Sequence, residues 1–130
     1  MKKVILFAAF ISVLFCLMSC EERKDYPLSR VEIWESGKKV SWIPNIVIGS
    51  TYTFTAKFFN SKSQEVQAPH PENVFWIADE ATASSATFTP TSGVTTSYVM
   101  TDYTRENTSG KIRVEYENLN SPEITVLFIR

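Results

Sequence analysis

The chain has 130 residues, with 13 basic and 14 acidic side chains and a formal net charge of −1. This length suits one domain, and the balanced charge argues against a nucleic-acid-binding protein, which carries a basic surface. The only histidine is His70, and the only cysteines are Cys16 and Cys20. So small a set argues against zinc sites and against catalysis that needs a cysteine or histidine cluster.

The first 19 residues have the features of a bacterial export signal. Lys2 and Lys3 precede an apolar run over residues 4–18 that only Ser12 interrupts. A short basic segment followed by such a run is typical of a signal peptide, and the run is shorter than the roughly 20 apolar residues of a membrane span. We therefore expect residues 1–19 to be a signal peptide.

The residues around Cys20 suggest a lipid anchor. Leu17-Met18-Ser19-Cys20 resembles the lipobox of bacterial lipoproteins, which implies cleavage before Cys20 and a diacylglycerol on its sulfur. Glu21 and Glu22 are similar to the acidic residues that follow the lipidated cysteine in surface-displayed lipoproteins of Bacteroidetes. The resemblance implies attachment to the outer membrane at the cell surface, with a periplasm-facing anchor as the alternative.

Cleavage at this position would leave residues 20–130 with a formal net charge of −3, because Lys2 and Lys3 would be lost. Cys16 would leave with the signal peptide and Cys20 would carry lipid. An intramolecular disulfide or a cysteine nucleophile is then excluded, and packing must stabilise the domain. Residues 20–27 form a short tether, and residues 28–130 form the domain.

The domain alternates apolar and polar residues in short runs, which is the pattern of half-buried strands. The alternation is clearest over residues 51–58, 110–117 and 124–129. Weaker strands are expected at 29–34, 40–43, 46–48, 74–77, 86–89 and 95–100. Turn residues separate these segments, so the sequence predicts an all-β fold: a two-sheet antiparallel β-sandwich of about seven to eight strands.

Three short motifs resemble those of bacterial immunoglobulin-like domains, especially group 2. They are IGSTYTFTA at residues 48–56, VFW at 74–76 and GKIRV at 110–114. The resemblance implies an immunoglobulin-like sandwich over residues 28–130 that serves as a spacer or adhesion module without catalytic apparatus. It also places Trp76 in the core, where such domains bury a tryptophan.

The residues that could carry chemistry are few and poorly placed for it. His70 lies between two prolines, which predicts an exposed loop with only Glu72 as a nearby metal ligand. Glu115 and Glu117 are expected on one solvated strand face, flanked by basic residues. Asp79 and Glu80 offer at most a loop calcium site. We expect no enzyme activity, no cofactor and no metal.

The aromatic residues are the best candidates for contact with a ligand or partner. If Val31 and Ile33 face the core, Trp34 faces outward. Trp42 lies beside an expected early edge strand, and Phe75 falls on the face opposite the core residues of its strand. Exposed aromatic side chains contribute strongly to interfaces and stack on sugars. Alternatively, the two tryptophans cover a sheet edge.

These observations favour a non-enzymatic binding or adhesion module on a lipid anchor. A structural accessory subunit of a membrane-protein assembly is one alternative, and a glycan-binding lipoprotein is another. One continuous apolar patch around Trp34, Trp42 and Phe75, larger than about 400 Å², would favour a protein partner. Isolated aromatic residues beside Asn, Asp or Glu would favour a glycan.

Overall fold

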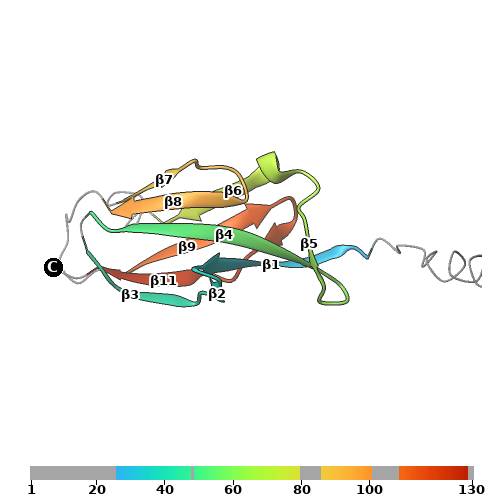
Figure 1. The fold of residues 1–130 in the computed structure, drawn as a ribbon, viewed down its shortest axis with the longest axis horizontal. Coiled ribbons are helices and arrows are strands. Elements are labelled where there is room, and N and C mark those ends of the chain that lie inside the picture. Colours follow the sequence, from blue (N-terminus) through green and yellow to red (C-terminus); the bar gives the residue numbers. More distant parts are fainter. Residues whose placement is uncertain (1–25, 48, 80–85, 101–108, 129–130) are drawn as a thin grey trace, which may run out of the picture.

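The computed structural model describes residues 26–47, 49–79, 86–100 and 109–128, and this part of the chain is almost entirely β (Figure 1). Its strands are β1 (Leu28–Glu35), β2 (Lys38–Lys39), β3 (Trp42–Ile46), β4 (Thr51–Asn60), β5 (Glu65–Val66), β6 (Val74–Ala78), β7 (Ala86–Thr89), β8 (Thr95–Met100), β9 (Ser109–Tyr116), β10 (Leu119–Asn120) and β11 (Ile124–Phe128). A short 3₁₀ helix, η1 (Pro71–Asn73), precedes β6.

The strands form two sheets. The first, here the β4 sheet, has the order β2-β1-β4-β8-β7, with β5 also paired to β4. The second, the β9 sheet, contains β9, β10, β11 and β3, with β6 also paired to β9. When the short strands and β3 are set aside, the order is first-second-fifth-fourth in one sheet and third-sixth-seventh in the other. That is the strand order of the immunoglobulin fold, so the predicted two-sheet sandwich is confirmed.

The sandwich has more strands than expected, because three two-residue strands extend its edges. It is also not wholly antiparallel, since β3 pairs in parallel with β11, with Val126 opposite Ile43. The chain leaves the β4 sheet after β2 and joins the β9 sheet as β3. Among the described strands β3 pairs with β11 alone, and it contains Pro44, which lacks an N–H group and suits an edge strand.

The core lies between the sheets and follows the predicted alternation. Phe54, Ala56 and Phe58 of β4 are at most 2% exposed, whereas their neighbours Thr55 and Lys57 point outward. Trp76 of β6 is buried as expected, and its indole N–H donates to the Gly93 carbonyl at 2.9 Å. Burying one large side chain of this kind contributes about 2 kcal/mol or more, so the buried aromatic residues between the sheets are a main source of stability.

The start of β1 and the β4–β5 turn lie at the same end of the sandwich (Figure 1). Leu28 is paired with Asn60, and the Ser61 N–H donates to the Pro27 carbonyl at 3.0 Å. Cys16, Cys20, Glu21, Glu22 and Glu80 lie outside the described residues. Within the described ranges, no helix is long and apolar enough to cross a membrane.

Candidate functional surfaces

The predicted contact residues lie on two opposite faces of the sandwich. Trp34 is in β1, on the outer face of the β4 sheet, whereas Trp42 and Phe75 are in β3 and β6 of the β9 sheet. The structure therefore brings Trp42 and Phe75 onto one outer face and leaves Trp34 on the other. The three residues do not form a single patch.

The outer face of the β4 sheet carries a buried carboxylate. Val31 and Ile33 of β1 point into the core, so Arg30, Glu32 and Trp34 point outward, as the alternation predicts. Glu32 is nevertheless only 7% exposed. A carboxylate at such a position needs hydrogen-bond donors around it, because burying an unpaired charge is costly.

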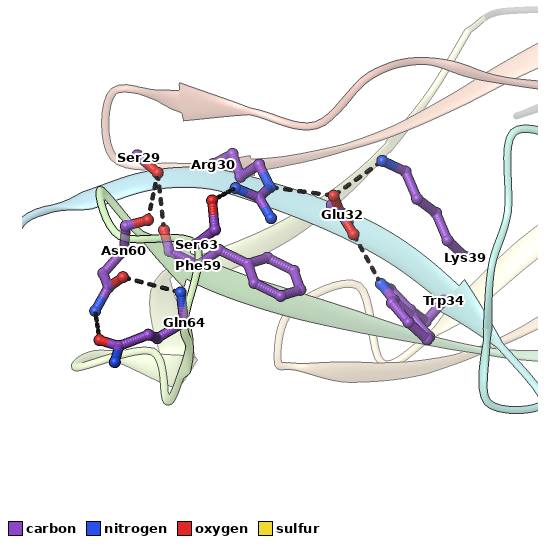
Figure 2. Close-up of polar contacts among 9 residues, drawn as sticks. All are labelled: Ser29, Arg30, Glu32, Trp34, Lys39, Phe59, Asn60, Ser63 and Gln64. Carbon is purple, nitrogen blue, oxygen red and sulfur yellow. Dashed lines mark hydrogen bonds and ion pairs between the residues drawn. The ribbon is translucent and has the colours of Figure 1, made fainter.

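Glu32 obtains these donors from three side chains (Figure 2). Its Oε1 accepts from Arg30 Nε at 3.1 Å and from Lys39 Nζ at 2.9 Å, and its Oε2 accepts from Trp34 Nε1 at 3.1 Å. Burial alone would raise the pKa of Glu32, but the hydrogen bonds from Lys39, Trp34 and Arg30 outweigh it and hold the pKa below its ordinary value. Glu32 is therefore a carboxylate at neutral pH.

The cations around Glu32 are themselves held in place. The Arg30 guanidinium lies 4.3 Å above the Phe59 ring, and its Nη1 donates to Ser63 Oγ at 3.0 Å. Lys57, which is opposite Glu32 on β4, lies 4.4 Å above the Trp34 ring. Such cation–π contacts contribute about 0.5–1 kcal/mol at exposed sites. We call Arg30, Glu32, Trp34, Lys39, Lys57 and Phe59 the Glu32 cluster.

The β4–β5 turn positions Ser63, whose hydroxyl accepts from Arg30 of the Glu32 cluster. Asn60 Oδ1 accepts from the backbone N–H groups of Lys62 and Gln64, both at 3.0 Å, which closes the turn. Ser29 Oγ donates to the Asn60 carbonyl at 2.8 Å and ties the turn to β1. Ser63 adopts a left-handed conformation, with φ 61°, and its hydroxyl lies beside Arg30 (Figure 2).

The outer face of the β9 sheet is organised differently. Trp42 is 53% exposed and Phe75 is 48% exposed. Trp42 is paired with Thr125, which in turn is paired with Lys111, while Phe75 is paired with Glu115. Lys111 and the charged residues of β9 thus separate the two aromatic side chains, which form two isolated contact points.

The charged residues on this face are paired at the surface. Arg113 contacts Glu115 at 2.6 Å, and Lys111 contacts Glu123 at 2.9 Å. All four side chains are more than a third exposed, and such pairs contribute about 0–1 kcal/mol. A further contact of 4.0 Å between Arg113 and Glu123 links the two pairs, but among the described residues of this face no charged side chain is buried as Glu32 is.

A cavity of about 330 Å³ opens beside Lys57 and Glu65. It lies along the edge of β4 that faces away from β1, where β4 changes its pairing partner. Phe58 is paired with Val66 of β5, whereas the N–H of Ala56 donates to the Val94 carbonyl. Its apolar walls are formed by Ala56, Phe58, Val66, Ala68, Pro71 and Val94. Lys57 and Glu65 form an ion pair of 3.0 Å at its side.

The catalytic and metal candidates are not brought together. His70 is exposed as expected, and its Nδ1 lies 3.3 Å from Glu72 Oε1. The expectation that Glu117 shares a strand face with Glu115 is wrong, because β9 ends at Tyr116 and Glu117 lies in the following turn with φ 51°. In the described residues, no group of three or more His, Cys, Asp or Glu side chains is placed to hold a metal ion.

Sequence reasoning missed Glu32, Lys39 and Lys57 as parts of one site. The available signal was a glutamate between two inward-facing apolar residues, with Arg30 two positions before it. The Ser36-Gly37 turn was a local signal that β2, and with it Lys39, folds back beside β1. The position of Lys57 beside Glu32 depends on pairing between segments distant in the sequence, which no local pattern shows.

When the chain is compared with protein-family models and with curated proteins, nothing matches.

Proposed function

We propose that this chain is a non-enzymatic envelope lipoprotein whose immunoglobulin-like sandwich is a binding or adhesion module. In this proposal, lipid on Cys20 holds the domain at the outer membrane, with the domain on the cell surface. The support for the anchor is the lipobox-like sequence that ends at Cys20. Two or more acyl chains hold a protein stably at a membrane, whereas one chain does so only marginally.

The position of the first strand is compatible with such an anchor. β1 begins at Leu28, eight residues after Cys20, at the end of the sandwich that also carries the β4–β5 turn (Figure 1). With lipid on Cys20, this end faces the membrane. The outer faces of both sheets then run roughly along the membrane normal, so a partner can reach them.

The exposure of Trp42 and Phe75 carries the binding proposal. Two large aromatic side chains, each about half exposed, lie on the outer face of one sheet. Burying side chains of this size against a partner releases more free energy than burying most other residues. We infer that the β9 sheet faces the partner and that Trp42 and Phe75 are its two anchors.

A glycan ligand is the second candidate for this face. Phe75 lies beside Glu115, and charged residues separate it from Trp42, so each ring is an isolated platform with polar neighbours. Sugars are bound by such a combination of a ring face and hydrogen-bonding groups. An accessory role in a membrane-protein assembly would instead bury both rings in one interface.

Lipidation is tested by metabolic labelling with a palmitate analogue. We expect labelling of the natural chain and none of the Cys20→Ser variant. A Cys16→Ser variant is the matched control and should be labelled normally. Persistent labelling of Cys20→Ser would refute the anchor at that residue.

Partner binding is tested by recovering the tagged chain, with Cys20 intact, from its native envelope. One stoichiometric membrane partner would support the accessory role in an assembly, whereas an adhesion module for external ligands should be recovered free. Any partner that is recovered should be lost from a Trp42→Ala/Phe75→Ala double variant and retained by a Lys111→Ala control. Loss of the partner from both variants would exclude the two aromatic residues as specific anchors. A glycan array probed with the natural chain and with both variants tests the second candidate, a glycan ligand.

A further inference from the structure

The outer face of the β4 sheet has a property that the aromatic face lacks: its cations are fixed before any ligand arrives. Glu32 Oε1 accepts from Arg30 and Lys39 together, so the two cationic groups are held side by side. Arg30 is also fixed by Phe59 and Ser63, and Lys57 by Trp34. Groups that are held in place lose little conformational entropy on binding.

The carboxylate at the centre cancels one of the three positive charges that Arg30, Lys39 and Lys57 bring to this face. Its side chain is only 9% exposed, and both oxygens accept hydrogen bonds. The side chains of Arg30 and Lys39 are 42% and 52% exposed, so solvent meets the cations rather than the carboxylate. Glu65, which pairs with Lys57, reduces the charge of the face but leaves it positive.

The arrangement of the cations indicates the shape of the ligand. Arg30, Lys39 and Lys57 come from β1, β2 and β4, three adjacent strands of one sheet. A single small anion would reach one or two of them, whereas an extended molecule with repeated negative charges can reach all three.

We propose that the Glu32 cluster binds an acidic polysaccharide through the carboxylate or sulfate groups of its sugars. This site lies on the opposite face from Trp42 and Phe75 and does not depend on the function proposed for them. Glu32 is a positioning residue, which fixes Arg30 and Lys39, and the three cations are the ligand contacts. Arginine suits this role because its guanidinium offers donors in a fixed plane.

The experiment measures binding of the purified full chain, in detergent, to polygalacturonate and to dextran sulfate at low ionic strength. Neutral dextran is the control polymer. We expect binding to at least one acidic polymer, no binding to dextran, and weakening by added salt because exposed charges are screened. Failure to bind either acidic polymer would overturn the proposal.

A matched pair of lysines tests whether the cluster itself is the site. Lys38 and Lys39 are the two residues of β2, and both are exposed. Of these two lysines, Lys39 is the one that the structure shows donating to Glu32. We expect Lys39→Ala to weaken binding about threefold or more and Lys38→Ala to change it less than about twofold. Equal effects would mean general charge attraction and would overturn the proposal.

Glu32→Gln provides the sharpest test, because two explanations predict opposite signs. It removes a negative charge, so general attraction predicts tighter binding of a polyanion. It also releases Arg30 and Lys39, so a site built on Glu32 predicts binding about threefold weaker. Circular dichroism must show that the variant is folded. Tighter binding would overturn the proposal, as would binding to phosphatidylglycerol vesicles alone.

Discussion

The tripeptide Arg-Val-Glu occurs twice in this protein, and the two copies end in different environments. Arg30, Val31 and Glu32 lie in β1, and Arg113, Val114 and Glu115 lie in β9. Both valines are fully buried, and both arginines bond the glutamate two residues later. Yet the Glu32 side chain is 9% exposed and the Glu115 side chain is 39% exposed.

The neighbouring strands explain this difference. Opposite Glu32 and Arg30 on β4 lie Lys57 and Phe59, and Lys39 of β2 is opposite Trp34. Opposite Glu115 and Arg113 on β6 lie Phe75 and Ile77, which offer no side-chain donor, and on its other side Glu115 is opposite the exposed, uncharged Asn120 of β10. An identical local sequence thus forms a closed cluster on one face and an open surface pair on the other, because the cross-strand neighbours determine how deeply each glutamate is buried.

The largest predicted contrast is between the losses of stability when Glu32 and Glu115 are each replaced by a neutral residue. Glu32→Gln removes the negative charge that two cations share and replaces one of the two acceptor oxygens with an NH₂ donor, and it should lower the free energy of unfolding by about 2 kcal/mol. Glu115→Gln removes one exposed pair and should cost less than about 1 kcal/mol. Urea denaturation at neutral pH measures both values. Equal losses would show that the neighbours of Glu32 add nothing.

Acid should erase this contrast. The pKa of Glu32 is lower in the folded chain than in the unfolded chain, so its stabilising contribution is complete above the unfolded value and is lost as the pH falls through the folded value. The stability difference between the natural chain and Glu32→Gln should be constant near pH 7 and shrink below about pH 4. A difference that grew on acidification would contradict this account.

The same dependence on neighbours limits what the sequence can predict. Alternation correctly assigns Val31 and Ile33 to the core and Trp34 to the outer face, because strand geometry is local. The parallel pairing of β3 with β11 depends on contacts between distant segments, so no local pattern reveals it. The two-residue strands pair with their neighbours in the chain across short turns, and two residues are too few to show an alternation. Sequence reasoning therefore named Trp34, Trp42 and Phe75 as candidate contacts, left open whether the two tryptophans are exposed, and missed the cluster around Glu32.

The two outward tryptophans provide a second, smaller contrast. Trp34→Phe removes the N–H donor to Glu32 and weakens the contact with Lys57, so it should cost about 1 kcal/mol. Trp42 is about half exposed on an edge strand, and Trp42→Phe should change stability by less than about 0.5 kcal/mol. Thermal unfolding of both variants measures the difference. A larger loss for Trp42→Phe would show that its ring is structural.

The smallest predicted effect tests the cause directly, by giving Glu115 the neighbour that Glu32 has. Phe75→Lys places a cation opposite Glu115, as Lys57 lies opposite Glu32. Cross-strand charge pairs contribute about 0.2–1 kcal/mol, and a double-mutant cycle with Glu115→Gln isolates that term from the loss of the phenyl ring. We expect a favourable coupling that declines at high salt, because this face is open to solvent. A coupling of zero would mean that one added cation does not suffice, and that the burial of Glu32 requires the indole of Trp34 and Lys39 as well.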